Sequence, residues 1–361
     1  MKVLHMASLN RASANLGVVQ QMEWEQLAAR EAGLDWDVEL WTTEAAQLGS
    51  VLRQVPRGMT GFFGRRYHFH RRLRAAARKY DRIVIRHAPL DPFSLFIPEW
   101  VRCKTWYVFH TKTGNYLTAR GKRFGKAFAW LDRQFTRCAI GNSAGIIGVT
   151  DELVEYEQDR LNRPSAKATV YPNGIFLAEW EAPIEDRREG ALKILFVASR
   201  FFEWNGLEKL LDTIVGTCAE GRWELHLVGH LMAHQEASIA ELDLADRIVV
   251  HGVLDKQAIA NLMASMDLSL GAFALDVVNA RSACTLKVRE SLGAGLPVYA
   301  GHSDVSVNDL PQCYTEGLVD WSAILAKAAE SRNRAKEDIR RAARQRIDKV
   351  ALLAGLAKQI S

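Results

Sequence analysis

The sequence predicts an α/β protein with two domains, each built around a parallel β-sheet. Short apolar segments with strand character, such as residues 82–86 (RIVIR) and 193–198 (KILFVA), alternate with segments of helical composition. This alternation is typical of parallel sheets covered by helices. The chain has 361 residues, which is long for one hydrophobic core and sufficient for two. A charged segment containing proline and glycine, residues 180–190, separates the two series of elements.

The first domain is expected over residues 1–175 and begins with a strand at Val3 and Leu4. A helix is expected over residues 18–32, because its apolar residues recur at helical spacing and Gly33 follows. The other expected elements are strands at 38–41, 82–86, 106–109 and 139–142, and helices at 124–138 and 150–161. His110 follows the strand at 106–109, and α/β proteins bind ligands at the carboxyl ends of parallel strands. His110 is therefore either a site residue or a histidine that is satisfied within the fold.

Residues 176–190 are expected to form the linker, and residues 191–325 the second domain. The turn signal Pro172-Asn173-Gly174 lies just before the linker. The strands expected in the second domain are 193–198, 225–228, 248–250, 268–270 and 298–300. Residues 326–361 have helical composition with mixed charge and are expected to form the C-terminal helices.

Composition limits the class of protein. Hydrophobic residues make up 48% of the chain and charged residues 25%, as in globular proteins. The five cysteines are scattered and have no paired spacing for zinc, so a reducing cytoplasm is expected. Residues 1–170 carry 26 lysines and arginines against 16 acidic residues, so the positive charge lies in the first domain.

A segment without acidic residues extends from residue 45 to residue 80. One interpretation is a solvated basic helix whose aromatic residues belong to the core. The other is a membrane-binding surface, because basic residues are attracted to an anionic leaflet and aromatic residues insert into it. The residues assigned to this membrane or acceptor surface are Arg65, Arg66, Arg71 and Arg72, with Phe62, Phe63, Tyr67 and Phe69 as aromatic anchors. Nucleic-acid binding is not expected, because no recognition motif accompanies the charge.

The segment 284–298 (CTLKVRESLGAGLPV) predicts a short helix, a turn and a strand. Val288 and Leu292 are spaced for one buried helical face, and Gly295 and Pro297 end the helix. A helix that follows a polar stretch presents free N–H groups, which attract phosphate. Glu290 lies one turn further on, close to the group that would carry the phosphate. An ordinary loop–helix–strand unit with a solvated glutamate is the alternative.

This segment resembles the donor-nucleotide motif of GT-B glycosyltransferases of family 4. Lys287, Glu290, Gly295, Pro297 and Val298 match its Lys-x-x-Glu-x-x-x-x-Gly-x-Pro-Val pattern. The resemblance implies two Rossmann-like domains facing a central cleft, with C-terminal helices that cross back to the first domain. It also implies retaining sugar transfer from a nucleoside diphosphate sugar, without a metal or other cofactor. In this reading Glu290 holds the ribose hydroxyls. The amides that hold the diphosphate are those of Thr285, Leu286 and Lys287.

Other positions extend the resemblance or depart from it. Arg200 matches an arginine that family members place on the donor diphosphate, whereas Asn205 occupies the position of a lysine. Gly17 resembles the N-terminal glycine loop that approaches the diphosphate, although a helix cap explains it equally well. His110 matches a residue that often faces the donor sugar. Ser282 stands where the family often has a further glutamate.

Three further hypotheses follow from these observations. The expected acceptor is a glycan or a lipid-linked molecule, which places the protein in the cytoplasm, peripheral on the inner face of the plasma membrane. A sugar-nucleotide epimerase of GT-B fold is one alternative. A non-catalytic nucleotide-sugar-binding partner is another, because the missing lysine and glutamate are compatible with a degenerate site.

Overall fold

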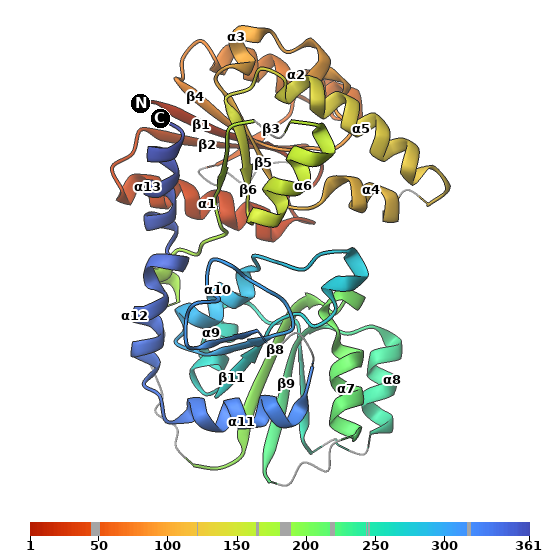
Figure 1. Ribbon diagram of the computed structural model, residues 1–361, viewed down its shortest axis with the longest axis vertical. Coiled ribbons are helices and arrows are strands. Elements are labelled where there is room, and N and C mark those ends of the chain that lie inside the picture. The colour runs from red at the N-terminus through yellow and green to blue at the C-terminus, as the bar shows by residue number, and fades with distance from the viewer. Residues whose placement is uncertain are drawn as a thin grey trace. The chain divides into compact units, whose positions relative to one another are not determined.

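The computed structural model describes residues 1–44, 51–120, 122–163, 166–180, 189–216, 221–242, 244, 246–315 and 319–361. The chain forms two compact units. The first comprises Met1–Phe176 and Lys349–Ser361, and the second comprises Leu177–Asp348. In Figure 1 each unit is a sheet with helices packed against it.

The first unit contains a parallel sheet with the strand order β3-β2-β1-β4-β5-β6-β7. Its strands are β1 (Val3–Ser8), β2 (Trp36–Thr42), β3 (Leu52–Gln54), β4 (Arg82–Arg86), β5 (Thr105–Phe109), β6 (Gly145–Gly148) and β7 (Ala168–Val170). Val84 lies in register with His5 of β1 and with Trp106 of β5. Residues in register share a face of the sheet, so these three side chains project from the same face.

Helices cover both faces of this sheet. They are α1 (Leu16–Glu31), α2 (Phe62–Ala76), α3 (Glu99–Arg102), α4 (Thr113–Arg120), α5 (Gly125–Ile140), α6 (Asp151–Leu161) and α13 (Lys349–Gln359), with the 3-10 helices η1 (Arg57–Met59), η2 (Pro92–Phe96) and η3 (Lys122–Phe124). Helices α1 and α13 pack together and share one core with Val84 and Trp106. Helices α5 and α6 contribute to a polar cluster on the opposite face, around His87.

The second unit contains a parallel sheet with the strand order β10-β9-β8-β11-β12-β13. Its strands are β8 (Leu192–Arg200), β9 (Trp223–His230), β10 (Ile248–Gly252), β11 (Leu268–Leu270), β12 (Val298–Ala300) and β13 (Cys313–Thr315). Its helices are α7 (Leu207–Gly216), α8 (Ala233–Glu241), α9 (Lys256–Ala264), α10 (Leu286–Gly293), α11 (Trp321–Arg332) and α12 (Lys336–Ile347), with η4 (Leu177–Glu179), η5 (Glu203–Asn205) and η6 (Leu275–Val278).

The C-terminal helices divide between the units. Helix α11 belongs to the second unit, because Trp321 is buried against Trp223 with ring centroids 4.9 Å apart. Arg332, at the other end of α11, forms an ion pair of 2.6 Å with Asp267. Only α13 joins the first unit, so the structure does not group residues 326–361 together. Residues 181–188 of the expected linker lie outside the described residues.

One expected strand is wrong. Residues 139 and 140 are the last turn of α5, and the strand forms at Gly145–Gly148. Ala139 and Ile140 are buried and continue the helical face that contains Thr136. The strand was not predicted because it begins with Gly145, which is not an apolar strand-forming residue. This glycine is required there because a Cβ atom would lie 2.3 Å from the Trp106 ring.

Among the residues that the structure describes, no helix is long and apolar enough to cross a membrane.

Candidate active site

Helix α10 begins at the carboxyl edge of the second sheet, after the loop that connects it to β11. Its N-cap residue, Thr285, has an extended backbone and makes no side-chain cap hydrogen bond. Thr285, Leu286 and Lys287 are half-buried, and the first turn contains no acidic residue. The first N–H groups of a helix have no partners within the helix. The start of α10 can therefore bind an anion.

Glu290 carries a buried carboxylate one turn into α10. Its side chain is 9% exposed and has no hydrogen bond or ion pair within the described residues. Burial raises the pKa of this carboxyl group, while the charges of Lys287 and Lys256 lower it. Burying an unpaired carboxylate costs free energy, so the site favours a ligand that donates hydrogen bonds to it.

Arg289, the residue before Glu290, has a different environment. Its guanidinium is fully buried and bonds both carboxylate oxygens of Asp304, with one contact of 2.8 Å. It also donates to the carbonyl oxygen of Thr285 at 3.3 Å and to the hydroxyl of Ser306. This clamp joins the start of α10 to the loop after β12. The sequence analysis missed Arg289, because a buried pair between a helix and a distant loop has no local spacing signal.

The turn after α10 explains the glycine in the motif. Gly295 has a φ of +75°, and a Cβ atom there would lie 2.5 Å from the carbonyl oxygen of Lys336. Leu296 then bonds back to the carbonyl of Ser291 at 2.8 Å. Substitution of Gly295 would therefore displace α12 or α10, so this residue has a structural role.

Arg200 ends β8, which is the neighbour of β11 in the sheet, so Arg200 and the start of α10 share the carboxyl edge. Arg200 is exposed, and its guanidinium lies 5.9 Å from the centroid of the Phe202 ring. Asn205 is committed to a turn, because its side-chain oxygen accepts a hydrogen bond of 2.9 Å from the Phe202 amide. Its carbonyl accepts another from Phe273 at 3.0 Å. The sequence-predicted residues of the second domain therefore lie along one edge of one sheet.

In the first unit, His110 follows β5 and Gly17 lies in the first turn of α1. Both are at the carboxyl edge of the first sheet. Burial lowers the pKa of His110 well below its ordinary value, and the nearby Arg86, His5 and Lys349 lower it further. The His110 Nε2 is buried without a hydrogen-bond partner in the described residues. A Cβ atom at Gly17 would contact nothing within 4 Å, so an approaching ligand or an ordinary helix start is compatible with this glycine.

The face of the first sheet that α1 and α13 cover contains a buried polar cluster centred on Glu25. Its carboxylate bonds the Nδ1 of His5 at 2.6 Å, the indole of Trp36 at 3.0 Å and the hydroxyl of Tyr171 at 3.2 Å. Lys349 of α13 completes it at 3.4 Å. Burial acts against the charged form of Glu25, but His5 and Lys349 outweigh it and lower the pKa to about 2. This cluster fastens α13 to the first sheet.

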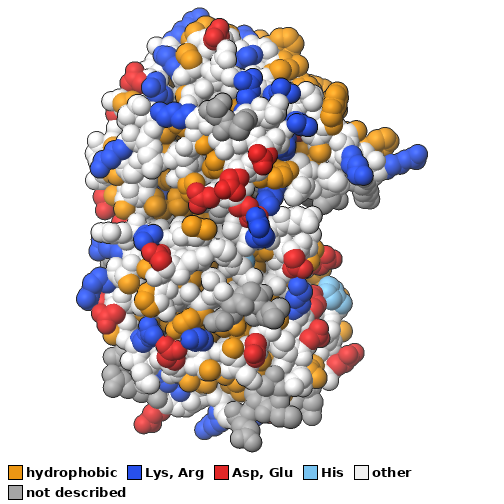
Figure 2. All heavy atoms as spheres, viewed as in Figure 1, with side chains coloured by type: hydrophobic (Ala, Val, Ile, Leu, Met, Phe, Trp, Pro, Cys, Tyr) orange, Lys and Arg blue, Asp and Glu red, His pale blue; other side chains and the backbone are white. Residues whose placement is uncertain are grey.

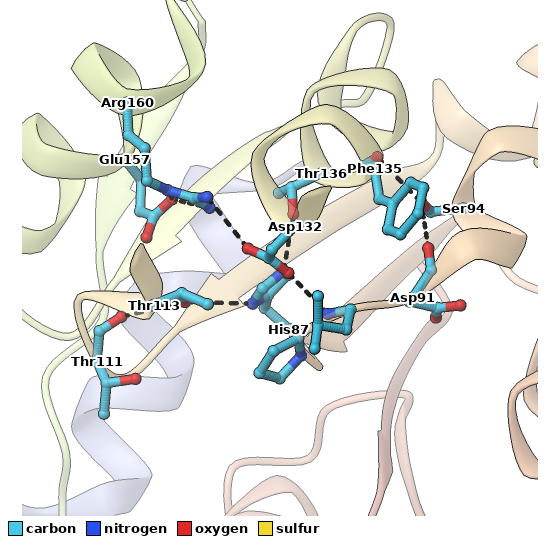
Figure 3. Close-up of polar contacts among 12 residues, drawn as sticks. His87, Asp91, Ser94, Thr111, Thr113, Asp132, Phe135, Thr136, Glu157 and Arg160 are labelled. Atoms are coloured by element: carbon cyan, nitrogen blue, oxygen red, sulfur yellow. Dashed lines mark hydrogen bonds and ion pairs between the residues drawn. The ribbon is translucent and has the colours of Figure 1, made fainter. Parts of the chain in front are cut away.

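A second polar cluster lies on the opposite face (Figure 3). His87 stacks on Phe109 with centroids 4.6 Å apart and bonds the hydroxyl of Thr136 at 3.1 Å. Asp132 accepts from the Leu90 amide at 2.8 Å and pairs with Arg160 at 3.1 Å. Burial lowers the pKa of His87 to about 4, with Asp132 acting in the opposite direction. These residues were not predicted, because they meet only when β4, α5 and α6 are assembled.

The basic segment forms α2, but its arginines differ in environment. Arg72 forms a half-buried ion pair with Glu39, and Arg66 donates to the carbonyl of Pro89 at 2.9 Å and lies 3.9 Å from Asp91. Arg65 is half-buried, whereas Arg71 is exposed and without a partner in the described residues. The four arginines therefore do not form one free surface. Residues 45–50, at the start of the segment, lie outside the described residues.

The aromatic residues of α2 also divide into two groups. Phe69 is 5% exposed and belongs to the core, so its expected role as an anchor is wrong. Phe63 is 65% exposed, and Phe62 and Tyr67 are exposed as well. A groove of about 560 Å³ runs between α2 and η2. It is lined by Tyr67, His70, Arg71, Arg74, Ala75, Arg78, Phe93 and Phe96.

Figure 2 shows basic side chains at the tip of the α4–α5 part of the first unit. Arg123 and Lys126 are exposed in this part of the chain, which also contains exposed aromatic residues. They are Tyr116, Phe124, Phe128 and Trp130.

The sequence contains one Asp-x-Asp triplet, Asp35-Trp36-Asp37, of the kind that binds metals in some sugar transferases. It lies at the amino end of β2, which is the edge opposite His110 and Gly17. The Asp37 carboxylate accepts from the Tyr80 hydroxyl at 2.7 Å, and Lys2 lies 3.8 Å from Asp35 and 3.9 Å from Asp37. These aspartates therefore form a surface ion cluster rather than part of the candidate site.

Known proteins resemble both parts of the chain. Residues 24–179 match the model of Glycosyltransferase Family 4. A search of curated proteins found no match. The apo form of the lipopolysaccharide outer core galactosyltransferase WaaB is 14% identical, with a TM-score of 0.65, and the match covers 100% of this chain and 99% of that one. A glycosyltransferase from Rickettsia africae ESF-5 is 11% identical, with a TM-score of 0.67 and coverage of 99% and 98%.

Alr3699/HepE from Anabaena, in complex with UDP and glucose, is 15% identical, with a TM-score of 0.64 and coverage of 100% and 99%. These likenesses extend over both units and include the parallel sheet of each. The chain therefore shares the two-sheet fold of these glycosyltransferases, and its residues 24–179 match the model of Glycosyltransferase Family 4.

Proposed function

We propose that the protein transfers a sugar from a nucleoside diphosphate sugar to a glycan or lipid-linked acceptor, in polysaccharide or glycolipid synthesis. The open carboxylate of Glu290 is the observation that carries this proposal. A buried carboxylate without a protein partner is stabilised by a ligand that supplies donors, and the two hydroxyls of a ribose supply a matching pair. Uridine nucleotides are the first donors to test, because the similarly folded HepE has been solved with UDP and glucose.

The diphosphate would lie at the start of α10. Glycosyl transfer builds positive charge on the sugar and negative charge on the departing diphosphate. Fixed donors aimed at that diphosphate favour the transition state over the ground state. The amides of Thr285, Leu286 and Lys287 would supply such donors, and Arg200 on the same sheet edge would supply charge. Asn205 would contribute by shaping the turn rather than by charge.

We further propose that the reaction retains configuration and needs no metal ion, as the family resemblance implies. Lys287 and Arg200 would provide the positive charge that a metal provides in other sugar transferases. His110 would face the donor sugar as a neutral hydrogen-bonding group, because its depressed pKa disfavours the imidazolium. Gly17 would allow the start of α1 to approach the substrate closely.

The exposed face of α2 would bring the enzyme to an anionic membrane that holds a lipid-linked acceptor, at the inner face of the plasma membrane. Three arginines line the groove there, and Arg71 and Arg78 have no partner within the described residues. Phe62, Phe63 and Tyr67 expose aromatic surface on the same helix. Basic and aromatic residues together provide the two contributions that a reversible surface anchor needs.

The test is incubation with UDP-, GDP- and ADP-sugars in the presence of a chelator, followed by detection of the released nucleotide. Turnover of one donor by the wild type and its loss in Glu290→Gln would support the proposal. Glu236→Gln, on the exposed helix α8, is the matched control and should keep full turnover. Undiminished turnover in Glu290→Gln would contradict the assignment of the donor site. Dependence of turnover on added metal would contradict the metal-independent mechanism.

A further inference from the structure

Arg86 is the last residue of β4 and lies at the carboxyl edge of the first sheet. It is in register with Val108 of β5, and Val84 is in register with His5 of β1. Alternate residues of a strand share a face, so Arg86, His110 and His5 project from the face covered by α1 and α13. His87, the next residue, projects from the opposite face and belongs to the cluster in Figure 3.

The Arg86 guanidinium has no acidic partner in the part of the chain that the structure describes. Within the described residues Arg86 makes no hydrogen bond and no ion pair, although burial lowers its pKa to about 10. Deeply buried cations that are paired include Arg160, which lies 3.1 Å from Asp132 in the first unit, and Arg289, which binds Asp304 in the second. A desolvated cation is normally compensated by an anion. The donors of Arg86 therefore remain available to a ligand.

A second polar side chain, His110, lies close to Arg86. The His110 Nε2 is buried without a partner in the described part of the chain. Burial is the largest cause that lowers the pKa of His110, and the charges of Arg86, His5 and Lys349 lower it further. Glu25, the acid within this cluster, is already bonded by His5, Trp36, Tyr171 and Lys349. Among the residues that the structure describes, this cluster therefore has no further carboxylate that could neutralise Arg86.

We propose that Arg86 and His110 form an oxyanion-binding site that holds a phosphate or carboxylate group of a substrate. The planar guanidinium fork matches such a group with two parallel hydrogen bonds, and the His110 Nε2 can complete its coordination. The first turn of α1 begins at the same sheet edge, where its free N–H groups favour negative charge. Assignment of the oxyanion to a sugar acceptor or to the diphosphate of the donor rests on the proposed function. The anion site itself does not.

The experiment titrates inorganic phosphate into protein labelled at histidine and follows the His110 ring by NMR. The resonance is assigned with His110→Gln. Phosphate should produce a saturable shift in the wild type, and its dissociation constant should increase at least tenfold in Arg86→Gln. Arg82→Gln is the matched control, because Arg82 lies on the same strand and face but bonds the Ile360 carbonyl at the other edge. Its phosphate affinity should equal that of the wild type.

Arg86→Lys is the second variant and should bind phosphate with intermediate affinity, because it keeps the charge and loses the fork. The same affinity in Arg86→Gln and wild type would overturn the proposal. Loss of the fold in both Arg86 variants would overturn it as well, since Arg86 would then be structural.

Repeating the titration with saturating UDP distinguishes the source of the oxyanion. A persistent His110 shift, with UDP affinity unchanged in Arg86→Gln, assigns the site to an anionic acceptor. Displacement of phosphate by UDP assigns it to the donor diphosphate. Both outcomes keep the oxyanion site and are independent of turnover, so a failure here differs from a failure of the transferase assay.

Discussion

The end of β4 and the N-terminal half of α10 place polar side chains in similar situations. In each, two consecutive titratable or charged residues lie at the carboxyl edge of a sheet. One member is enclosed by partners: His87 by Thr136 and Asp132, and Arg289 by Asp304. The other, Arg86 or Glu290, is desolvated and has no partner within the described residues. The enclosed residues stabilise the scaffold, and the open residues are those to which the proposed ligands would bind.

The two open groups differ in sign, and this difference separates the tasks of the two units. An open cation in the first unit suits an oxyanion, whereas an open carboxylate in the second suits hydroxyl donors. Desolvation alone does not identify a site, because Arg289 is more deeply buried than Glu290. The informative feature is desolvation without a partner. Substitutions of enclosed residues should therefore change stability, and substitutions of open residues should change binding.

The largest effect is expected for Arg289→Met. This substitution leaves Asp304 buried without its cation, and breaking a buried ion pair in this way costs about 3–5 kcal/mol. Urea denaturation followed by circular dichroism measures the change in the free energy of unfolding. The double variant Arg289→Met/Asp304→Leu should recover most of the loss, because it removes both charges. A single variant as stable as the wild type would show that the clamp contributes little.

A smaller effect concerns pH. The pKa of His87 is about 4 in the folded state and 6.5 ordinarily, so the unfolded state binds more protons between these values. The contribution of His87 to the free energy of unfolding is therefore most favourable above pH 6.5. As the pH falls from 6.5 toward 4, the free energy of unfolding decreases by up to about 3 kcal/mol. Glu157 acts in the opposite direction, because burial raises its pKa to about 7. The prediction therefore concerns the difference between wild type and His87→Gln.

The free energy of unfolding should fall less steeply with decreasing pH in His87→Gln than in the wild type. Denaturation curves at intervals from pH 7 to pH 4 measure both slopes. Equal slopes would mean that His87 is already protonated in the folded protein or becomes exposed.

Glu290→Gln should separate binding from stability. Donor affinity should fall by about 1–3 kcal/mol, the usual worth of a charge-assisted hydrogen bond. The free energy of unfolding should stay equal or increase, because the substitution removes a desolvated charge. Calorimetric titration with UDP measures the first change and thermal denaturation the second. A destabilised variant with unchanged UDP affinity would reverse the assignment of Glu290 as an open residue.

Local patterns predicted most of the fold, and they failed where packing decides. Strands such as Arg82–Arg86 and the helix–turn–strand unit at Gly295 follow from periodicity and turn chemistry. The strand Gly145–Gly148 was missed, because its glycine is selected by contact with Trp106. Glu290 was predicted as a site residue from a local motif. Arg86 was not predicted, because its position beside His110 follows only from the register of β1, β4 and β5.

The smallest effect tests the same contrast within one helix, α2. Arg71 is exposed and unpartnered in the described residues, whereas Arg72, the next residue, is held by Glu39. Basic residues near an anionic leaflet contribute about 1 kcal/mol each. Arg71→Gln should therefore weaken co-sedimentation with phosphatidylserine vesicles about fivefold, without changing the melting temperature. Arg72→Gln should lower the melting temperature, because it leaves the buried carboxylate of Glu39 without its cation, and should leave vesicle binding nearly unchanged. Added salt should reduce the binding of wild type and Arg72→Gln alike, since the attraction is screened. Equal recovery with neutral and anionic vesicles would assign the arginines of α2 to a solvated helix surface and would remove the membrane from the proposed function.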